Sequence, residues 1–437
     1  MHASPPPRPR VAVIGSGIAG LSAALGLQDA CAVVLYEASP RLGGHILPVP
    51  VHDPQGRPAA VDTGFVVFVP EAYPRVTALL ESLGVGHAPA VTRFRITDDT
   101  RALSFEPAEL LGLCGRRLPQ ACRRDLLHMH RTLQRIRKEG LAWIDAVSMD
   151  QWMADQGFAP ETMELGVLPW VASFWGLQPE TVRTVAAPVA LREIARNAGP
   201  ARMHRVLPST QVYLDRLLDA LAPTEVRHEA VTRVQLEGGL AVHTARGAEP
   251  FDRIVVATTA EDARALLPDA PPRVRALLAQ VTYQSTVAVL HRDTALLPAD
   301  RSTWRTFHHR RRRDPDRLRS VTTWVLDLLH EWHADPTQID TPTLLTTGDP
   351  GLVDEGIIDP GRVVEAFRHR HLVMTPAMLD ALAELPQLDA DQPFTLAGSY
   401  ASLGGLHEDA LASGIRAAAK VRGELGLPPP RWPWDGP

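Results

Sequence analysis

The chain has 437 residues, of which 45% are hydrophobic and 22% are charged, and its formal net charge is −5. This length predicts two domains with a large interface, and the mildly acidic balance argues against nucleic acid as a partner. The sequence shows neither a signal peptide nor a run of the ~18 apolar residues needed to span a bilayer, and its three cysteines lack metal-ligand spacing, so we expect a cytoplasmic protein with reduced thiols and no metal site.

The first predicted elements form a nucleotide-binding unit. A short apolar strand at residues 11–14 runs into a Gly-x-Gly-x-x-Gly turn, and an Ala- and Leu-rich helix follows. Gly15 would take the tight turn, Gly17 would let the backbone approach a pyrophosphate, and Gly20 would let the helix pack on the strand. The start of the helix would offer free N–H groups to the phosphates. The predicted contacts from this turn are Gly15, Ser16, Gly17, Ile18, Ala19 and Gly20.

A second apolar strand at residues 32–36 ends at Glu37. An acidic side chain about 20 residues past the glycines is placed to accept hydrogen bonds from an adenosine ribose. Gly43 and Gly44 follow, and they would let the backbone pass beside the same pyrophosphate, while Arg41 would neutralise its charge. The alternative is two glycine-rich turns that bind nothing, with Arg41 facing solvent.

Residues 37–44 resemble the Glu-x(3)-Arg-x-Gly-Gly segment of a superfamily that contains flavin-dependent amine oxidases, phytoene desaturases and protoporphyrinogen oxidases. Residues 61–68 resemble the next segment of that superfamily, which runs along the flavin. The resemblance implies FAD as the cofactor. The contacts it adds in these two segments are Ala38, His45, Gly64 and Phe65.

Residues 105–205 have a mostly helical pattern that prolines interrupt, and they carry several aromatic residues. Aromatic residues in such a pattern are more often part of a core than of a substrate pocket. The stretch at 169–176 combines aromatic residues with helix breakers, so Trp170, Phe174 and Trp175 are the candidate pocket residues of this region.

The chain then alternates strand and turn patterns as far as residue 257, and this part resembles the returning half of a flavin domain, where the Val231 backbone would contact the adenine. Three later strands would form a sheet over the substrate site. Between the first two of them, the run His308–Arg313 is predicted as a solvated turn, and the alternative is a basic patch for a lipid surface or an acidic carrier. The three predicted strands are 282–291, 320–328 and 343–347.

Near the end of the chain, a strand from residue 394 opens into a glycine-rich loop and a helix, as in the C-terminal flavin signature of the same superfamily. By this resemblance the backbone N–H groups of Asp409 and Ala410 meet the N1/O2 edge of the flavin, and the Ser399 side chain meets the ribitol. The alternative is an ordinary strand–turn–helix unit. Gly398 and His407 complete the predicted cofactor contacts.

Tyr400 and His407 are the candidate catalytic residues, because they are the polar side chains that the resemblance places nearest the flavin ring. His407 would donate or accept a proton, since the charge of a histidine changes near neutral pH. The alternative is that His407 only caps the helix or supports other residues. Tyr400 is also a candidate pocket residue.

Three short motifs are similar to those of a bacterial group of predicted NAD/FAD-binding proteins associated with cyclopropane fatty-acid synthases. They are Gly-Gly-His at 43–45, Asp-Thr-Gly-Phe at 62–65 and His-Glu-Asp at 407–409. Residues 205–210 depart from this group, which usually has Gly-Gly-Ser there. Residues 283–288 contain no lysine, although flavin amine oxidases commonly hold one beside flavin N5 in this strand.

These patterns predict an α/β plus α+β protein with two discontinuous domains. A Rossmann-type FAD-binding domain would consist of residues 1–72, 205–275 and 393–437. A substrate domain with a mixed sheet and helices would consist of residues 73–204 and 276–392.

The predicted function is that of an FAD-dependent oxidoreductase that removes hydride from, or isomerises, a largely apolar substrate, with a lipid-like molecule or a specialised metabolite as the candidates. One alternative is an amine or amino-acid oxidase of the same fold that produces hydrogen peroxide. A second is a non-catalytic carrier of an apolar ligand, as in the related Rab GDP-dissociation inhibitors. Peripheral contact with a membrane or a carrier is open.

Overall fold

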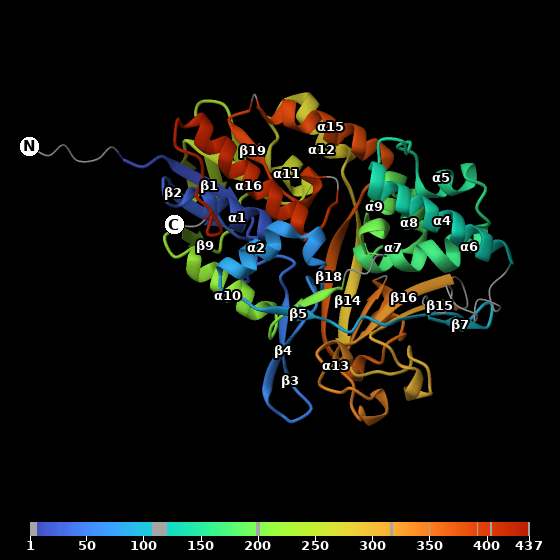
Figure 1. The fold of residues 1–437 in the computed structure, drawn as a ribbon. Helices are drawn as coiled ribbons and strands as arrows, with labels where there is room; N and C mark the ends of the chain where they lie inside the picture. Colours follow the sequence, from blue (N-terminus) through green and yellow to red (C-terminus); the bar gives the residue numbers. More distant parts are fainter. Residues whose placement is uncertain are drawn as a thin grey trace, which may run out of the picture.

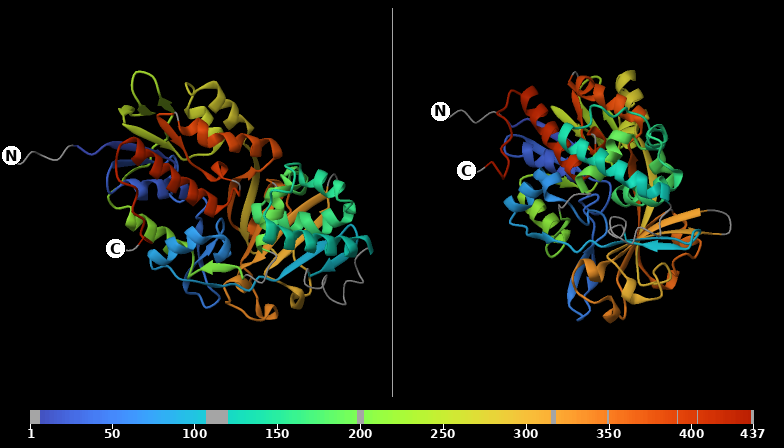
Figure 2. Two further views of the ribbon diagram at one scale, coloured as in Figure 1. Left: turned by 45° about the horizontal axis from the view of Figure 1, so that its top comes forward. Right: turned by 45° about the vertical axis from the view of Figure 1, so that its right-hand side comes forward.

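The computed structural model describes residues 7–106, 120–197, 202–314, 318–348, 350–390, 392–402 and 404–435. A parallel sheet with its covering helices lies beside a larger mixed sheet that carries a second group of helices (Figures 1 and 2). The predicted fold class, α/β combined with α+β, is therefore confirmed.

The nucleotide sheet, as we call the parallel sheet, has five strands in the order β19-β13-β1-β2-β9. Its strands come from three separated parts of the chain, as predicted. Residues 11–14 in its centre are all buried, because both faces of the sheet are covered, and two-sided burial is typical of parallel strands. The strands are β1 (Arg10–Ile14), β2 (Ala32–Tyr36), β9 (Glu225–Arg227), β13 (Arg253–Val256) and β19 (Phe394–Leu396).

Two helices from opposite ends of the chain, α1 (Ile18–Leu27) and α16 (His407–Glu424), cover one face of this sheet side by side (Figure 1). Gly414 of α16 sits directly on α1, and a Cβ atom there would lie 2.1 Å from the carbonyl oxygen of Ala19. The other face packs against the antiparallel strands β10 (Arg233–Gln235), β11 (Ala241–Thr244) and β12 (Gly247–Pro250). The first and last segments of the chain are thus held together at one site.

The large sheet, as we call the mixed sheet, has seven strands in the order β18-β14-β17-β16-β15-β6-β7. All neighbours are antiparallel except β15 and β6. The predicted strand at 282–291 coincides with β14, whereas the one at 320–328 ends at Val325 because a short helix follows. The strands are β6 (Phe94–Asp98), β7 (Leu103–Phe105), β14 (Thr282–His291), β15 (Phe307–Arg313), β16 (Leu318–Val325), β17 (Leu344–Gly348) and β18 (Val363–Val373).

Helices make up most of the described residues between 120 and 197, in agreement with the predicted helical pattern broken by prolines. They lie against one side of the large sheet (Figure 2). They are α4 (Gln120–Glu139), α5 (Met149–Asp155), α6 (Pro160–Thr162), the π-helix η3 (Met163–Val167), α7 (Leu168–Trp175), α8 (Pro179–Thr184) and α9 (Ala187–Asn197).

The remaining elements connect the two sheets or cover their edges. The α-helices are α2 (Pro74–Ser82), α10 (Thr210–Ala220), α11 (Ala260–Leu266), α12 (Pro272–Gln280), α13 (Leu326–Leu329), α14 (Gly351–Asp354) and α15 (Pro376–Ala390). The 3₁₀ turns are η1 (Pro70–Ala72), η4 (Arg301–Thr303), η5 (Pro336–Gln338), η6 (Pro360–Arg362) and η7 (Ser399–Ala401). Two strand pairs complete the fold, β3 (Pro48–His52) with β4 (Pro58–Asp62) and β5 (His87–Pro89) with β8 (His204–Val206).

The prediction of a solvated turn at residues 308–313 is wrong, because this run belongs to strand β15 in the interior of the large sheet. Its arginines pair with acids from other elements. Arg310 Nε lies 2.9 Å from Asp99 Oδ2, and Arg311 pairs with Glu164. The charge run looked solvated because the acids that neutralise it are distant in the sequence. For these two arginines, the ion pairs also argue against an unpaired basic patch.

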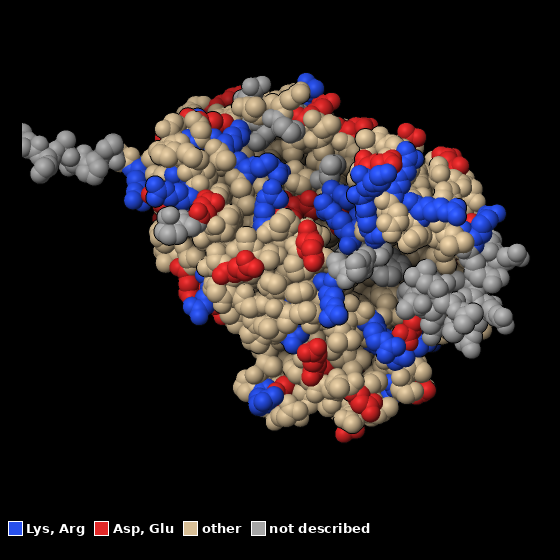
Figure 3. Space-filling view, viewed as in Figure 1, with Lys and Arg blue, Asp and Glu red and all other residues tan. Residues whose placement is uncertain are grey.

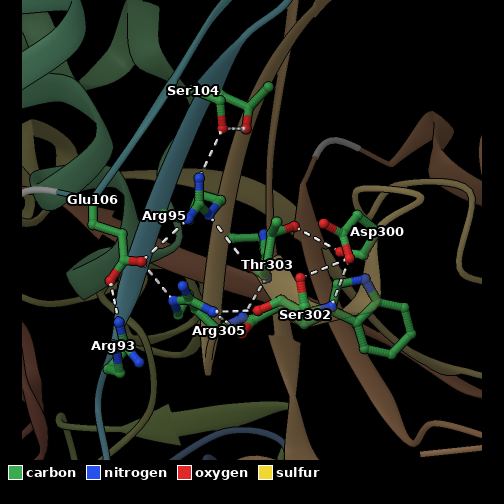
Figure 4. A network of polar contacts seen from close by, with 11 residues as sticks. Arg93, Arg95, Ser104, Glu106, Asp300, Ser302, Thr303 and Arg305 are labelled. Atoms are coloured by element: carbon green, nitrogen blue, oxygen red, sulfur yellow. Dashed lines mark hydrogen bonds and ion pairs between the residues drawn. The ribbon is translucent and has the colours of Figure 1, made fainter. Parts of the chain in front are cut away.

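A second charged network fixes the edge of the same sheet (Figure 4). The carboxylate of Glu106 lies 2.9 Å from Arg93, 3.1 Å from Arg95 and 2.6 Å from Arg305. Burial alone would raise the pKa of Glu106, but the ion pairs with Arg305 and Arg93 outweigh it and lower that pKa. Basic and acidic side chains are also spread together over the face shown in Figure 3.

Buried histidines in and beside the large sheet predict that the protein loses stability in weak acid. Burial lowers the pKa of His308 to about 3 and those of His291, His309 and His330 to about 4. The unfolded chain, with histidine pKa values near 6.5, therefore binds more protons than the native protein below about pH 6.5. The free energy of unfolding therefore falls as the pH is lowered, by up to about 1.4 kcal/mol per pH unit for each such histidine.

Urea unfolding between about pH 7.5 and pH 5 measures this slope above the range in which most carboxylates titrate. We expect His309→Gln to reduce the slope and His130→Gln, on the exposed face of α4, to leave it unchanged. A free energy of unfolding that does not change over this range would contradict the prediction.

Candidate active site

The glycine turn after β1 has the strained, close-packed geometry that the sequence predicts. Gly15 has φ +102°, and its N–H donates to the Tyr36 carbonyl at 2.8 Å. A Cβ atom on Gly15 would lie 2.6 Å from the Ala257 carbonyl oxygen, and one on Gly20 would lie 1.8 Å from the Gly15 carbonyl oxygen. Only glycine fits at these two positions, so the turn holds the start of α1 tightly against the strand end.

Gly17 is different, because a Cβ atom there would meet nothing within 4 Å. Gly44 lies beside it, since a Cβ atom on Gly44 would be 3.0 Å from the Gly17 Cα atom. The N–H of Gly43 donates to the Ser16 carbonyl at 3.1 Å. The turn at Gly17 and the pair Gly43 and Gly44 therefore form one open cradle at the N-terminus of α1, which fits a pyrophosphate.

Glu37 lies at the end of β2 beside this cradle. Its Oε2 atom accepts hydrogen bonds from the Ser16 N–H at 2.9 Å and the Ser16 hydroxyl at 2.6 Å, and its Oε1 atom accepts from the Ser39 N–H at 2.8 Å. The carboxylate is thus held where an adenosine ribose would reach it. The Arg41 guanidinium lies 6.0 Å from the ring centre of Phe367 on β18, so this loop also contacts the large sheet.

The C-terminal loop lies at the same strand ends. Gly398 has φ +149°, and a Cβ atom there would be 3.3 Å from the Thr258 carbonyl oxygen, one residue after the Ala257 that contacts Gly15. The Gly398 N–H donates to Ser413 Oγ of α16 at 2.9 Å. The two glycine-rich turns therefore flank one short segment at the end of β13.

The start of α16 corrects one predicted flavin contact. The N–H of Ala410 donates to the Leu406 carbonyl at 3.0 Å inside the helix, so it is not free for a flavin oxygen. The N–H groups at the first helical positions, including that of Asp409, lack such intrahelical carbonyl partners. The Asp409 carboxylate accepts from the Leu406 N–H at 3.2 Å, and Glu408 accepts from the Val76 N–H at 2.9 Å, which caps α2.

His407 is packed between two aromatic rings. Its ring stacks on Phe65 at a centroid distance of 4.1 Å and an interplanar angle of 11°, and its Nε2 atom lies 3.3 Å from the Tyr213 hydroxyl. Burial, with a smaller effect of His45, lowers the pKa of His407 to about 3. The expectation that its charge changes near neutral pH is therefore wrong in this structure, because protein atoms replace the water that would stabilise the imidazolium.

Gly64 and Phe65, which were predicted to contact the flavin, pack against the backbone of His45. The Phe65 N–H donates to the His45 carbonyl at 2.9 Å, and a Cβ atom on Gly64 would be 2.2 Å from that oxygen. Asp62 accepts hydrogen bonds from the N–H and hydroxyl of Thr210 at 2.9 and 2.6 Å, and burial raises its pKa to about 7. Thr210, in the stretch that departs from the Gly-Gly-Ser pattern, is thus bound to the predicted flavin segment.

Two candidate pocket residues are buried instead of lining an open space. Tyr400 is 1% exposed, and its ring packs against Gly398. Trp175 is buried, and its Nε1–H donates to the Gly404 carbonyl at 3.0 Å. Both side chains therefore pack against the C-terminal loop at Gly398 and Gly404 and help to hold its conformation. The side chains of Trp170 and Phe174 lie outside the described part of α7.

Ser399 begins the short turn η7 after Gly398, Ala38 is exposed beside Glu37, and Val231 is partly buried just before β10. Their predicted contacts with ribitol, ribose and adenine stay predictions. A separate recess between β6, β15 and α7 is lined by Glu164, Arg183 and other polar residues. The Glu164 carboxylate there already pairs with arginines, so we assign this recess no role in the reaction.

Sequence reasoning missed two histidines at the site. His369 and His371 lie on β18, and the ring centroid of His369 is 5.0 Å from that of His45. Burial and the neighbouring His45 lower the pKa of His369 to about 3 and that of His371 to about 4. The alternating histidines in the run Arg368–His371 were the available signal, because alternate residues of a strand share one face.

The sequence model of the family described as "Flavin containing amine oxidoreductase" matches residues 18–336, which is most of the chain. The chain belongs to this family. The superfamily resemblance inferred from the glycine and C-terminal motifs is thereby confirmed, and FAD is the cofactor. The association with cyclopropane fatty-acid synthases has no support from these matches.

Several solved structures share the fold. A CLA-producing fatty acid isomerase from P. acnes has 15% identity, with 93% of this chain and 97% of that chain aligned at a TM-score of 0.68. Cyclohexylamine oxidase from Brevibacterium oxydans IH-35A has 18% identity, with 96% and 100% aligned at a TM-score of 0.66. Putrescine oxidase bound to putrescine has 16% identity, with 95% and 99% aligned at a TM-score of 0.65. No curated protein sequence matches the chain.

Because it belongs to this family, the protein is an FAD-dependent oxidoreductase. This interpretation replaces the alternative of a non-catalytic carrier of an apolar ligand. The open cradle at Gly17 and the acid at the end of β2 fit the pyrophosphate and ribose of FAD. In the described residues, no helix is long and apolar enough to cross a membrane.

Proposed function

We propose that this family member oxidises, desaturates or isomerises a largely apolar substrate and not an amine. The observation that carries the proposal is that residues 283–288 of β14 include no charged side chain. Thr286 and Gln284 of β14 pair with His369 and His371 of β18, so this part of β14, where amine oxidases commonly carry a lysine, offers only neutral groups. The half-buried histidines beside it are neutral at pH 7, since their pKa values lie near 3 and 4.

FAD, when bound, would supply the redox chemistry of hydride transfer to or from the substrate. The chain's own residues would bind the FAD and stabilise charge on its ring. The Gly17–Gly44 cradle would hold the pyrophosphate, and Glu37 would hold the ribose. The free N–H groups and positive dipole at the start of α16 would stabilise negative charge that develops on the ring.

The relatives support two substrate classes. The fatty acid isomerase favours an apolar acid as substrate, and the absence of a lysine between Tyr283 and Ala288 favours the same class. The family description and the cyclohexylamine oxidase keep amine oxidation as the second candidate. If this second candidate is right, the protein would release hydrogen peroxide from simple amines.

Anaerobic bleaching of the flavin separates the two candidates. We expect unsaturated fatty acids or related apolar molecules to reduce the flavin or to be converted to isomers, and primary amines to do neither. Bleaching by simple amines together with peroxide release in air, without any conversion of apolar compounds, would overturn the proposal. Extraction of small molecules that copurify with the protein, followed by mass spectrometry, would narrow the choice of compounds.

His407→Ala is expected to slow turnover by on the order of 100-fold if this residue moves a proton, while the flavin content stays close to that of the unchanged protein. Tyr213→Phe is the matched control, because it removes only the hydroxyl that lies 3.3 Å from His407 Nε2. Its effect on turnover should be much smaller. Unchanged kinetics in His407→Ala would instead assign the ring a structural role against Phe65.

A cytoplasmic location is part of the same proposal. Cys31 and Cys122 are buried free thiols, and burial raises the pKa of Cys31 to about 11. Free thiols are typical of proteins in a reducing compartment, and a raised pKa makes a thiol less reactive. Peripheral contact with a membrane, which would help deliver an apolar substrate, stays a prediction.

A further inference from the structure

Three histidines from distant parts of the chain meet beside the cofactor cradle. One ring nitrogen from each of His45, His369 and His371 lies within 4.8 Å of the other two. The ring centroids are 5.0 Å apart for His45 and His369, 5.9 Å for His45 and His371, and 5.6 Å for His369 and His371. His45 follows the second glycine pair, and the other two project from the same face of β18.

Two ring nitrogens of this cluster lack partners. Within the described part of the chain, His369 Nε2 and His371 Nδ1 are buried and make no hydrogen bond. A buried polar atom without a partner costs about 1–3 kcal/mol, so the cluster would gain from a ligand that the nitrogens can bind. Neutral imidazole is the form that coordinates metals, and burial keeps the His369 and His371 rings neutral by lowering their pKa values.

We propose that His45, His369 and His371 bind one divalent transition-metal ion of the Zn²⁺ or Co²⁺ type. Imidazole is a preferred ligand of these ions. Bonds of about 2.0–2.1 Å in tetrahedral geometry need ligand nitrogens about 3.4 Å apart, so the rings need to close by little more than 1 Å. Three protein ligands leave one position open for water or for an oxygen atom of a substrate.

The end of α7 holds one of the three rings in position. Gly176 has φ +62°, and a Cβ atom on it would lie 2.3 Å from His371 Cε1. The backbone of Trp175 and Gly176 also favours the protonated state of His371 and partly offsets the lowering of its pKa. The positive charge of Arg41, which lowers the pKa of His369 further, opposes any bound cation.

The test uses tag-free, flavin-loaded protein that has been treated with a chelator and then dialysed against Zn²⁺ or Co²⁺. We expect one ion per chain by elemental analysis, and Co²⁺ absorption bands on the long-wavelength side of the flavin bands. His369→Gln and His371→Gln should each weaken binding by at least about 100-fold. His130→Gln, which changes an exposed histidine on α4, should leave binding unchanged.

Gly176→Ala provides a variant that keeps all three ligands, and we expect it to weaken binding because its methyl group would press on the His371 ring. Absence of stoichiometric binding by the unchanged protein would overturn the proposal. Metal binding by His369→Gln and His371→Gln that is as tight as binding by the unchanged protein would also overturn it. The flavin absorbance, recorded on the same samples, reports cofactor binding separately, so a failed metal site leaves the proposed oxidoreductase function untouched.

Discussion

Replacing Gly17 with valine is expected to give a folded protein that binds little or no FAD. In the protein alone, a Cβ atom at Gly17 would meet nothing within 4 Å, so the larger side chain has room. That room is the cradle formed with Gly44, and a branched side chain there would push the pyrophosphate away from the N-terminus of α1. We expect the Kd for FAD to rise at least about tenfold, which corresponds to a loss of about 1.4 kcal/mol of binding free energy or more, and the flavin-to-protein ratio to fall.

Gly423→Val is the matched control for this variant. Gly423 is exposed near the end of α16, and a Cβ atom there also meets nothing within 4 Å. Its flavin content should equal that of the unchanged protein, and the free energy of unfolding of both variants without FAD should change little. Full flavin occupancy in Gly17→Val would contradict our placement of the pyrophosphate.

Gly414→Val is expected to have the largest effect on stability. A Cβ atom at this position would lie 2.1 Å from both the Ala19 carbonyl oxygen and Ser22 Oγ. Backbone on the facing helix cannot move aside cheaply, so α16 would have to separate from α1. Overpacking of this kind costs about 1–3 kcal/mol and occasionally more, and we expect the upper end of that range, with flavin lost as α16 shifts.

Urea unfolding measures this loss, again with Gly423→Val as the control on the same helix. A Gly414→Val protein with unchanged unfolding and unchanged flavin content would show that the tail does not need to pack closely on the first helix. That outcome would remove the basis for a site shared by the two ends of the chain.

The cofactor-binding part of the site could be predicted from the sequence, because its requirements are local. Gly15 and Gly20 are needed for close backbone contacts, and an acid at the end of the second strand follows from the length of a strand–helix–strand unit. These constraints act within about 30 residues. Gly43 and Gly44 depend on the same unit and lie beside Ser16 and Gly17, while their contacts with the pyrophosphate stay predictions.

The parts that the sequence could not predict depend on which distant segments meet. The basic strand β15 resembles a solvated turn until Asp99 and Glu164 are brought to it by other elements. The cluster of His45 with His369 and His371 requires β18 to cross the loop after the glycines. The prediction for Trp175 came from aromatic residues beside helix breakers, and that for Tyr400 came from the family resemblance, but both side chains are buried beneath the C-terminal loop.

The pKa of His407 shows the same limit in chemical terms. Sequence alone gives a histidine its ordinary pKa near 6.5, whereas stacking on Phe65 and burial lower the pKa of His407 to about 3. The ring lies against Phe65 of the predicted flavin segment, and its place beside the flavin ring stays a prediction. Its protonation state could be judged only from the packing around it.

The central claim is that the first and last segments of the chain bind one FAD molecule together. A crystal structure of the FAD complex tests it most directly. We predict the pyrophosphate at the Gly17–Gly44 cradle, the adenosine ribose at Glu37, and the flavin ring toward the start of α16 near His407. A flavin ring directed away from residues 398–410, or FAD bound at any other place, would contradict the account.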